Sequence, residues 1–304
     1  MELQQMRYVV AVAEERSFTR AAERCFVVQS SLSHQIKALE RELGVELFAR
    51  SSRRVEPTAA GEAFLPAARA SLEAAERAVD DAAAATGRVR GTLTIGMIPT
   101  VTALDVPEAL RRFRQAHPDV RVRLRGGGSD GFIAAIGRGE MDVAVLGLAG
   151  DVDQAGVASR VLARERLAAV VSAEHRLAPR RRLRLSDLAE EIFVDFPAGT
   201  PGRAQSDIAF AAAGVRREVM LEAVDAPTIL DLVRADLAVA LLPPAVVPEG
   251  EGLVAVPVAD GPTRTEHLAW SGFNPSPATR AFLAMAGEGS ARVAGEPVTD
   301  PSGR

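Results

Sequence analysis

The segment from Ser17 to Gly44 carries two helical patterns separated by a very short turn, and this arrangement restricts the fold more than any other feature of the chain. The first pattern runs from Ser17, a good helix cap, to Arg24. Residues 26–28 form the turn. The second helix begins at Gln29 and ends at Gly44, because glycine readily adopts the left-handed conformation found at helix C-termini. With one helix before them, these elements predict a helix-turn-helix.

Apolar residues mark the expected inner faces of the first and third helices of this head. The two stripes are Leu3, Met6, Val10 and Ala13, and Leu32, Ile36, Leu39 and Leu43. Segments 45–50 and 53–57 then predict two short strands joined by an arginine-bearing loop, which is a wing. We therefore expect a winged helix-turn-helix over residues 1–58.

A heptad seam follows the wing, with apolar residues at steps of three and four. Its positions are Leu65, Ala68, Leu72, Ala75, Val79 and Ala82. The seam predicts a long linker helix over 59–87 that pairs two copies of the chain, bent near Pro66 because proline lacks the N–H of a helical turn. Half of the seam positions are alanine, which bury little surface, so we expect pairing to need support from elsewhere.

Beyond Gly87, β-rich runs alternate with amphipathic helices, and the alternation occurs twice, which predicts parallel strands in two α/β lobes. The runs are 92–98, 106–116, 120–125, 129–138 and 142–146, and then 192–196, 203–213, 219–224, 228–235 and 238–242. A late strand at 266–271 and a helix at 277–286 return to the first lobe, and two connections between lobes suit a hinged cleft.

These patterns set the expected domain bounds. The α/β domain covers 88–290, with lobe I at about 91–161 and 265–287 and lobe II at about 162–264. The Gly-, Ser-, Pro- and Glu-rich stretch from Gly287 to Arg304 predicts disorder, and we place the disordered tail at 291–304.

Composition excludes several classes of protein. The single cysteine, Cys25, cannot form an internal disulfide, and a small buried hydrophobe is favoured over a redox sensor, which usually has a resolving partner. The start of the chain lacks a signal segment, and the longest apolar run, 237–247, is interrupted by prolines, so we expect neither secretion nor a membrane span. The four histidines lack the spacing of metal ligands, and no set of catalytic residues is visible, so we expect neither an enzyme nor a cofactor. With a single cysteine, we expect the protein to act in the reducing cytoplasm.

Basic charge is concentrated in the head. Eight basic and four acidic side chains lie from Arg16 to Arg54, although the whole chain carries a net charge of −4. Because salt screens charges over ~8 Å, the head can attract a polyanion even though the rest of the chain is acidic.

The outer face of the third helix carries side chains that suit a nucleic acid. Opposite the apolar stripe lie Ser30, His34, Lys37 and Arg41, with Ser31 and Ser33 on the flanks. Hydroxyls near a helix N-terminus donate to phosphate, and His34 and Lys37 can reach guanine acceptors in the major groove. The alternative, a solvated helix face, is weakened by the neighbouring turn, wing and linker helix. Arg50, Arg53 and Arg54 would contact phosphate or the minor groove.

Residues 1 to about 61 resemble the N-terminal domain of LysR-type transcriptional regulators. The matching residues are Ser17-Phe18-Thr19 with Ala21-Ala22, Gln29 to Ile36, Leu39-Glu40, Leu43-Gly44, Leu47-Phe48, Arg50, and Pro57-Thr58 with Gly61. The resemblance adds Ser17, Thr19 and Gln29 to the DNA-binding set. It departs at Met6, where the family commonly has Phe, and at Val28, where a small hydroxyl residue often caps the recognition helix and contacts phosphate.

The resemblance continues to about Ala286, and it implies a periplasmic-binding-protein-like effector domain, a ligand in the cleft between the lobes, and tetramers built from dimers. The residues that it places in the cleft are Pro99, Thr100, Thr102, Ser129, Phe196, Gly199 and Thr200. Free N–H groups and hydroxyls there would suit a carboxylate or another anion. Simple helix capping explains the threonines and the serine equally well.

Two glycine features of the α/β domain remain. Gly126-Gly127-Gly128 lacks the spacing and the lysine of a phosphate loop, so we expect no nucleotide site.

At 235–239, relatives usually have a glycine on each side of the apolar residue. Asp236 can still adopt a left-handed turn, but Ala238 needs an ordinary conformation, so the ligand pocket can differ from that of relatives.

We therefore expect a homodimeric or homotetrameric transcription regulator that binds double-stranded DNA, senses a small molecule, and can act through RNA polymerase, with no membrane partner. A constitutive regulator without a ligand is the alternative for the effector domain. A solute-binding or enzymatic α/β protein with an incidental helical module is the alternative class, and it lacks the signal peptide or the reactive residues that it would need.

Overall fold

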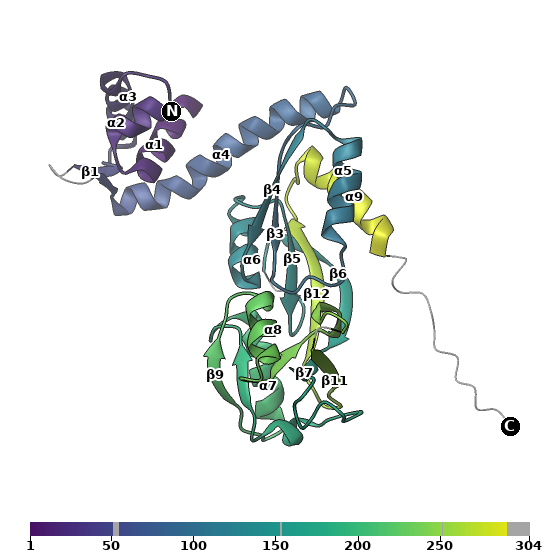
Figure 1. Ribbon diagram of the computed structural model, residues 1–304. Helices are drawn as coiled ribbons and strands as arrows, with labels where there is room; N and C mark the ends of the chain where they lie inside the picture. Colours follow the sequence, from purple (N-terminus) through teal and green to yellow (C-terminus); the bar gives the residue numbers. More distant parts are fainter. Residues whose placement is uncertain (51–54, 153, 251, 291–304) are drawn as a thin grey trace. The chain divides into compact units, whose positions relative to one another are not determined.

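The computed structural model describes residues 1–50, 55–152, 154–250 and 252–290, and the chain divides after Thr86 into two compact units. The first unit contains three short helices, a two-stranded wing and one long helix (Figure 1). These elements are α1 (Leu3–Glu15), α2 (Phe18–Arg24), α3 (Gln29–Leu43), β1 (Phe48–Arg50), β2 (Val55–Pro57) and α4 (Ala59–Ala84).

The ends of the helices in the head follow local capping rules. The Ser17 hydroxyl accepts a hydrogen bond from the Arg20 N–H at 3.4 Å, and Gly44 ends α3 with a φ of +72°. Both positions are those that the sequence predicts. In the wing, β1 and β2 pair antiparallel, with Phe48 opposite Pro57.

The core of the head confirms one predicted stripe and corrects the other. Leu32, Ile36 and Leu39 of α3 are fully buried, but Leu43 is 37% exposed because it lies in the last turn, beyond the packed part of the helix. The stripe predicted for α1 is only partly correct: Val10 and Ala13 pack at the edge of the core, whereas Leu3 is 46% exposed. The buried residues of α1 are Gln5, Tyr8, Val9, Ala11 and Val12, because α1 packs against α2, α3 and α4 at once.

The long helix α4 begins inside the head and continues beyond it. The Thr58 hydroxyl caps α4 by accepting from the Gly61 N–H at 3.1 Å. Gly61 is required there, because a Cβ would lie 2.1 Å from the carbonyl oxygen of Leu47. Leu65 and Ala68 are buried, whereas the later seam residue Val79 is 55% exposed in the single chain. Pro66 lies within the helix as predicted.

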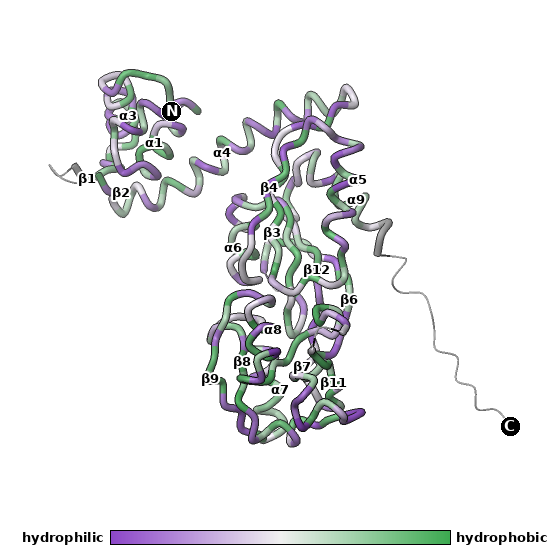
Figure 2. Tube along the Cα trace, in the orientation of Figure 1, coloured by the Kyte–Doolittle hydropathy of each residue, from purple (hydrophilic) through white to green (hydrophobic). Residues whose placement is uncertain are grey.

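In the second unit, lobe I is built on a five-stranded sheet with the order β4-β3-β5-β12-β6. Its elements are β3 (Gly91–Met97), α5 (Val106–Ala116), β4 (Val120–Gly126), α6 (Ser129–Gly137), β5 (Val143–Leu148), β6 (Val157–Arg166), β12 (Thr263–Ser271) and α9 (Pro277–Ser290). Helix α6 covers one face of the sheet, and α5 and α9 cover the other (Figure 1). Hydrophobic residues are concentrated along β3 and β5 in the middle of the sheet (Figure 2).

Lobe II contains two smaller sheets. Strands β10, β7 and β11 pair antiparallel in that order, β8 and β9 pair parallel, and an isolated bridge joins Phe193 to Val239. The elements are β7 (Ala168–Ser172), η1 (Leu185–Leu188), β8 (Ile192–Asp195), α7 (Pro201–Ala212), β9 (Glu218–Glu222), α8 (Ala226–Arg234), β10 (Ala240–Leu242), η2 (Pro244–Val246) and β11 (Leu253–Pro257).

The expectation of parallel strands holds for β3, β4 and β5, for the β8 and β9 pair, and for the bridge between Phe193 and Val239. The other pairings, β10 and β11 with β7 and β12 with its neighbours, are antiparallel. Strand β12 runs antiparallel to both β5 and β6. The sequence also did not predict β6, β7 or β11. Four charged residues interrupt β6, so it lacks the alternation of a half-buried strand.

Two crossings connect the lobes. The chain leaves the lobe I sheet at Leu167, after β6, and returns to it at Thr263, where β12 begins opposite Arg166. Helix α9 continues to Ser290, so the prediction of disorder from Gly287 is wrong for four residues, and 291–304 lie outside the described residues. Asp236 has a φ of +56° and Ala238 is not left-handed, as predicted.

Candidate functional site

The outer face of α3 is exposed and hydrophilic. The predicted residues exposed on this helix are Gln29, Ser30, Ser31, His34 and Lys37, and Ser33 is half-buried. They lie opposite Leu32 and Ile36, which are fully buried in the head. The helix therefore presents hydroxyl, imidazole and ammonium groups to a partner while its apolar side holds the fold.

No side chain caps the N-terminus of α3. Val28 occupies the cap position in an extended conformation and offers no acceptor. Within the described part of the chain, no acceptor meets the backbone N–H groups of Ser30 and Ser31. Unsatisfied N–H groups and the helix dipole make such an end electropositive, so it can bind a phosphate oxygen.

The remaining predicted residues of the head have different surroundings. The hydroxyl of Ser17 is occupied as the cap of α2, and Thr19 is exposed in the next turn. Arg50 ends β1, but its side chain lies outside the described residues, as do Arg53 and Arg54. Phe26, in the turn before α3, is 95% exposed and left-handed, with a φ of +57°.

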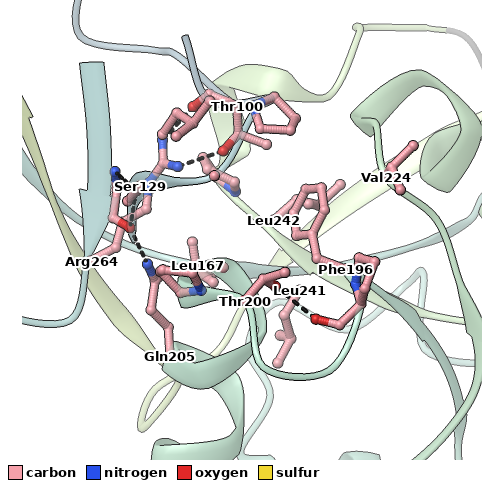
Figure 3. A pocket seen from close by; sticks show the side chains of 18 of the residues that line it. Thr100, Ser129, Leu167, Phe196, Thr200, Gln205, Val224, Leu241, Leu242 and Arg264 are labelled. Carbon is pink, nitrogen blue, oxygen red and sulfur yellow. Dashed lines mark hydrogen bonds between the residues drawn. The ribbon is translucent and has the colours of Figure 1, made fainter. Parts of the chain in front are cut away.

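A pocket of about 250 Å³ lies between lobe I and lobe II of the second unit. Ser129 and Arg264 lie on one side of it and Phe196 on the other (Figure 3). Most of its walls are apolar, including Ile98, Leu167, Phe196, Leu241, Leu242 and several prolines. An apolar cavity with a few polar groups is the usual form of a small-molecule site.

Five of the seven residues predicted for the cleft line this pocket. They are Pro99, Thr100, Ser129, Phe196 and Thr200. Thr102 and Gly199 do not line it. The alternative of simple helix capping holds for Thr200, whose hydroxyl accepts from the Arg203 N–H at 3.4 Å. It is wrong for Ser129, whose hydroxyl instead bonds both the N–H and the carbonyl of Gly147, at 3.0 and 3.2 Å.

The loop after β3 carries the predicted cleft residues Pro99, Thr100 and Thr102, and the helix that follows it begins where the sequence predicts. Helix α5 begins at Val106, and the Asp105 carboxylate accepts from the Glu108 N–H at 3.0 Å. Earlier in the loop, the N–H groups of Thr102 and Ala103 donate to the Glu266 carboxylate at 3.1 and 3.0 Å. These N–H groups are therefore occupied by a buried side chain of the protein itself, and we correct the expectation that they are free for an anion.

Sequence reasoning missed two polar residues of the pocket, Arg264 and Gln205. Arg264 is buried on β12, and its Nη1 donates to the Thr100 hydroxyl at 2.6 Å. Gln205 of α7 reaches across from lobe II, and its Nε2 donates to the Gly147 carbonyl at 3.1 Å. The sequence could have indicated Arg264, because charged and uncharged residues alternate at the start of β12. No pattern in the sequence around Gln205 marks it as a pocket residue.

Buried charges hold the aromatic wall of the pocket in place. The Phe196 N–H donates to Asp195 at 2.7 Å, and Arg203 donates to the Phe196 carbonyl at 3.3 Å. Arg217 pairs with Asp195 at 2.6 Å and lies 5.3 Å from the ring centroids of two phenylalanines. Burial raises the pKa of Asp195, although Arg217 beside it favours the carboxylate.

The thiol of Cys25 lies in the head. Cys25, predicted as a small buried hydrophobe, is half-buried and packs against the head core, and burial raises the pKa of its thiol. No cluster of three or more His, Cys, Asp or Glu side chains that could hold a metal ion occurs within the described ranges. None of the described helices is long and apolar enough to span a membrane.

Two family models match the chain. Residues 3–62 match the bacterial regulatory helix-turn-helix protein of the lysR family, and residues 86–291 match the LysR substrate binding domain. Among curated proteins, the transcriptional regulator ShiR of Corynebacterium glutamicum is 34% identical over 84% of this chain and 86% of its own length. The regulator IlvR of Caulobacter vibrioides is 33% identical over 95% of this chain and 98% of its own length.

Solved structures agree with this grouping. A full-length OxyR variant from Pseudomonas aeruginosa has a TM-score of 0.74 and 27% identity, covering 96% of this chain and 95% of that one. Full-length CbnR in complex with its target DNA has a TM-score of 0.68 and 28% identity, covering 95% of this chain and all of that one.

Proposed function

This chain belongs to the LysR family of bacterial transcriptional regulators, and from that premise we propose that α3 enters the major groove of an operator while the pocket of the second unit receives the effector. The observation that carries the first part is the division of α3 into a buried apolar face and an exposed polar face. The proposed base-contacting residues are Ser33, His34 and Lys37. The free N–H groups at the start of the helix would bind phosphate.

The same proposal assigns roles to the rest of the chain. Residues 1–58 form the DNA-binding domain, 59–87 the dimerisation helix and 88–290 the effector-binding domain. In the single chain, the seam residue Leu72 is half-buried and Val79 is exposed, which supports pairing with a second copy. The regulator would act in the cytoplasm as a homo-oligomer, with double-stranded DNA, a small molecule and RNA polymerase as partners.

A mobility-shift titration with the DNA upstream of its own coding region tests the DNA part. We expect Lys37→Glu to abolish the specific shift, and Lys37→Ala to weaken specific binding by about 1–3 kcal/mol and to relax specificity for the base that it contacts. Arg123→Glu, the same charge reversal on exposed strand β4 of the other unit, is the control and should bind as wild type does. Unchanged binding by Lys37→Glu would refute the assignment.

A metabolite library screened by melting temperature on the full-length protein tests the pocket part. A ligand that binds the native state raises the melting temperature by mass action. Val224→Trp should abolish the response to any compound found, because Val224 lines the pocket and is exposed, so a larger side chain fills the pocket without disturbing the core. A response that survives Val224→Trp would place binding elsewhere. A library without any hit would favour the constitutive alternative.

A further inference from the structure

The charge of the pocket is already balanced by the protein. Among the residues that the structure describes, Arg264 is the one charged residue lining the pocket. Its guanidinium pairs with Glu165 at 2.7 Å and with Glu266 at 3.0 Å. We call these three residues the hinge cluster, because they lie on β6 and β12, next to the crossings between the lobes. One cation between two carboxylates leaves a surplus of negative charge, so a ligand carboxylate placed there would be repelled.

Glu266 removes a second possible anion site. Besides the two loop N–H groups, it accepts from the Thr102 hydroxyl at 3.0 Å, and its side chain is fully buried. The donors of the β3–α5 loop therefore bind an internal carboxylate. On the lobe II side, the hydroxyl of Thr200 caps α7 and Pro201 has no N–H, so that helix start offers little to an anion.

The start of α6 remains open. Gly128 occupies the cap position and has no side chain to accept from the first turn, and Ser129 turns its hydroxyl to Gly147 instead. In the described chain, no acceptor meets the N–H groups of Ser129, Asp130 and Gly131. Gly128 and Ser129 both line the pocket. This end of the pocket can therefore hold one carboxylate.

Gln205 supplies an independent sign of a ligand. The residue is 4% exposed, and its amide nitrogen must face lobe I because it donates to the Gly147 carbonyl. The amide oxygen then has no hydrogen-bond donor among the described residues, although the side chain lines the pocket. This oxygen is not one of the described buried atoms that lack a partner, so it keeps access to the pocket, and a hydroxyl or amino group of a ligand can donate to it.

The two polar anchors lie close together. The Ser129 hydroxyl and the Gln205 amide nitrogen contact the same carbonyl oxygen of Gly147, at 3.2 and 3.1 Å. The donor group of a ligand must therefore lie near its carboxylate. The remaining walls are apolar, and a volume of about 250 Å³ suits a small ligand.

We propose that the effector is a small monocarboxylic acid that carries a hydroxyl or amino group close to its carboxylate and an apolar remainder. The carboxylate binds at the start of α6, the donor binds Gln205, and the apolar remainder packs against Phe196 and its neighbours. The inference rests on the proposed function of the pocket and narrows the chemistry of its ligand. It also excludes dicarboxylates, because the hinge cluster already holds excess negative charge.

Three probe acids that differ in one substituent test this chemistry by calorimetric titration of the full-length protein. Mandelate, 2-phenylpropionate and phenylmalonate carry a hydroxyl, a methyl and a second carboxylate at the same carbon. We expect mandelate to bind about tenfold more tightly than 2-phenylpropionate, because the hydroxyl satisfies Gln205. We expect phenylmalonate to bind more weakly than either. Equal binding of the first two, tighter binding of phenylmalonate, or binding of none would overturn the proposal.

Substitutions locate the two anchors. Gln205→Met keeps the size of the side chain but removes its oxygen, so mandelate should lose its advantage over 2-phenylpropionate. Gln115→Met, at an exposed position of α5, is the control and should keep it. A preference that survives in Gln205→Met would contradict the role of Gln205.

Gly128→Asp tests the carboxylate anchor without disturbing the fold. No atom lies within 4 Å of a Cβ at Gly128, and its extended backbone is that of an ordinary cap residue. The new carboxylate should cap α6, raise the melting temperature of the free protein and abolish binding of all three acids. Gly126→Asp adds the same charge at an open position that does not line the pocket, and should leave binding unchanged. Acid binding retained by Gly128→Asp would overturn the proposal.

The outcomes separate this proposal from the one that it rests on. The metabolite library can yield a ligand whose binding Val224→Trp abolishes. If that ligand is a dicarboxylate or lacks a donor group, the proposed class of effector is wrong and the assignment of the pocket stands. If no ligand is found, both fail. The mobility shift of the wild-type protein is independent of either result.

Discussion

Replacement of Arg264 by methionine should destabilise lobe I strongly. In the wild type, Arg264 lies between Glu165 and Glu266, and Glu266 is fully buried. Without the guanidinium, two neighbouring carboxylates remain and no cation balances them. Removal of one partner from a buried ion pair costs about 3–5 kcal/mol, because the other charge stays buried. In a domain of this size, each kcal/mol lowers the melting temperature by about 2–4 °C, so we expect a decrease of roughly 6–20 °C.

The fluorescence of Trp270 reports this transition. It is the single tryptophan of the chain, and it lies on β12, the strand that also carries Arg264 and Glu266. Its side chain packs against the core of lobe I, so its emission should change when that lobe unfolds. Thermal unfolding of the full-length protein followed at this residue gives the melting temperature of the relevant part.

A second substitution shows whether charge is the cause. Glu266→Gln in the Arg264→Met background removes one of the two unbalanced charges, so the double variant should be more stable than Arg264→Met by at least about 1 kcal/mol. Arg121→Met, on the exposed edge strand β4, is the control and should change stability by less than about 0.5 kcal/mol. A melting temperature of Arg264→Met within about 2 °C of the wild type would refute the reasoning, as would a double variant no more stable than the single one.

Three further predictions concern the first unit. Phe26→Gly should stabilise the head by about 0.5–1 kcal/mol, measured by thermal unfolding followed at Tyr8, because it relieves a left-handed backbone at a side chain that is almost fully exposed. Cys25 should react with a thiol reagent at pH 8 more slowly than free cysteine does, because burial raises its pKa and lowers the thiolate fraction; a rate equal to that of free cysteine would contradict this. Val79→Glu should weaken self-association in sedimentation experiments, because Val79 is an exposed seam position, and Glu76→Asp, at a neighbouring exposed position off the seam, should not.

Several features of the site depend on contacts that no local pattern contains. Glu266 and Thr102 are 164 positions apart, and only the packing of β12 beside the β3–α5 loop joins them. Gln205 is one of many polar residues on an ordinary amphipathic helix, and its importance arises from the Gly147 carbonyl of the other lobe. The expectation of free N–H groups in that loop failed for the same reason, since the Glu266 carboxylate accepts from Thr102 and Ala103.

Local patterns, by contrast, were sufficient for much of the molecule. The division of α3 into a buried and an exposed face, its glycine end and the cap at Ser17 follow from residues a few positions apart. The same is true of the order of strands and helices from β3 to β5 in lobe I, although not of β6. Helical and strand periods are set by neighbouring residues, so the sequence alone determined the head, the linker helix and the likeness to a family of regulators. Tertiary structure decided which polar groups remain unpaired in the pocket, because pairing depends on distant strands and loops that meet only after folding.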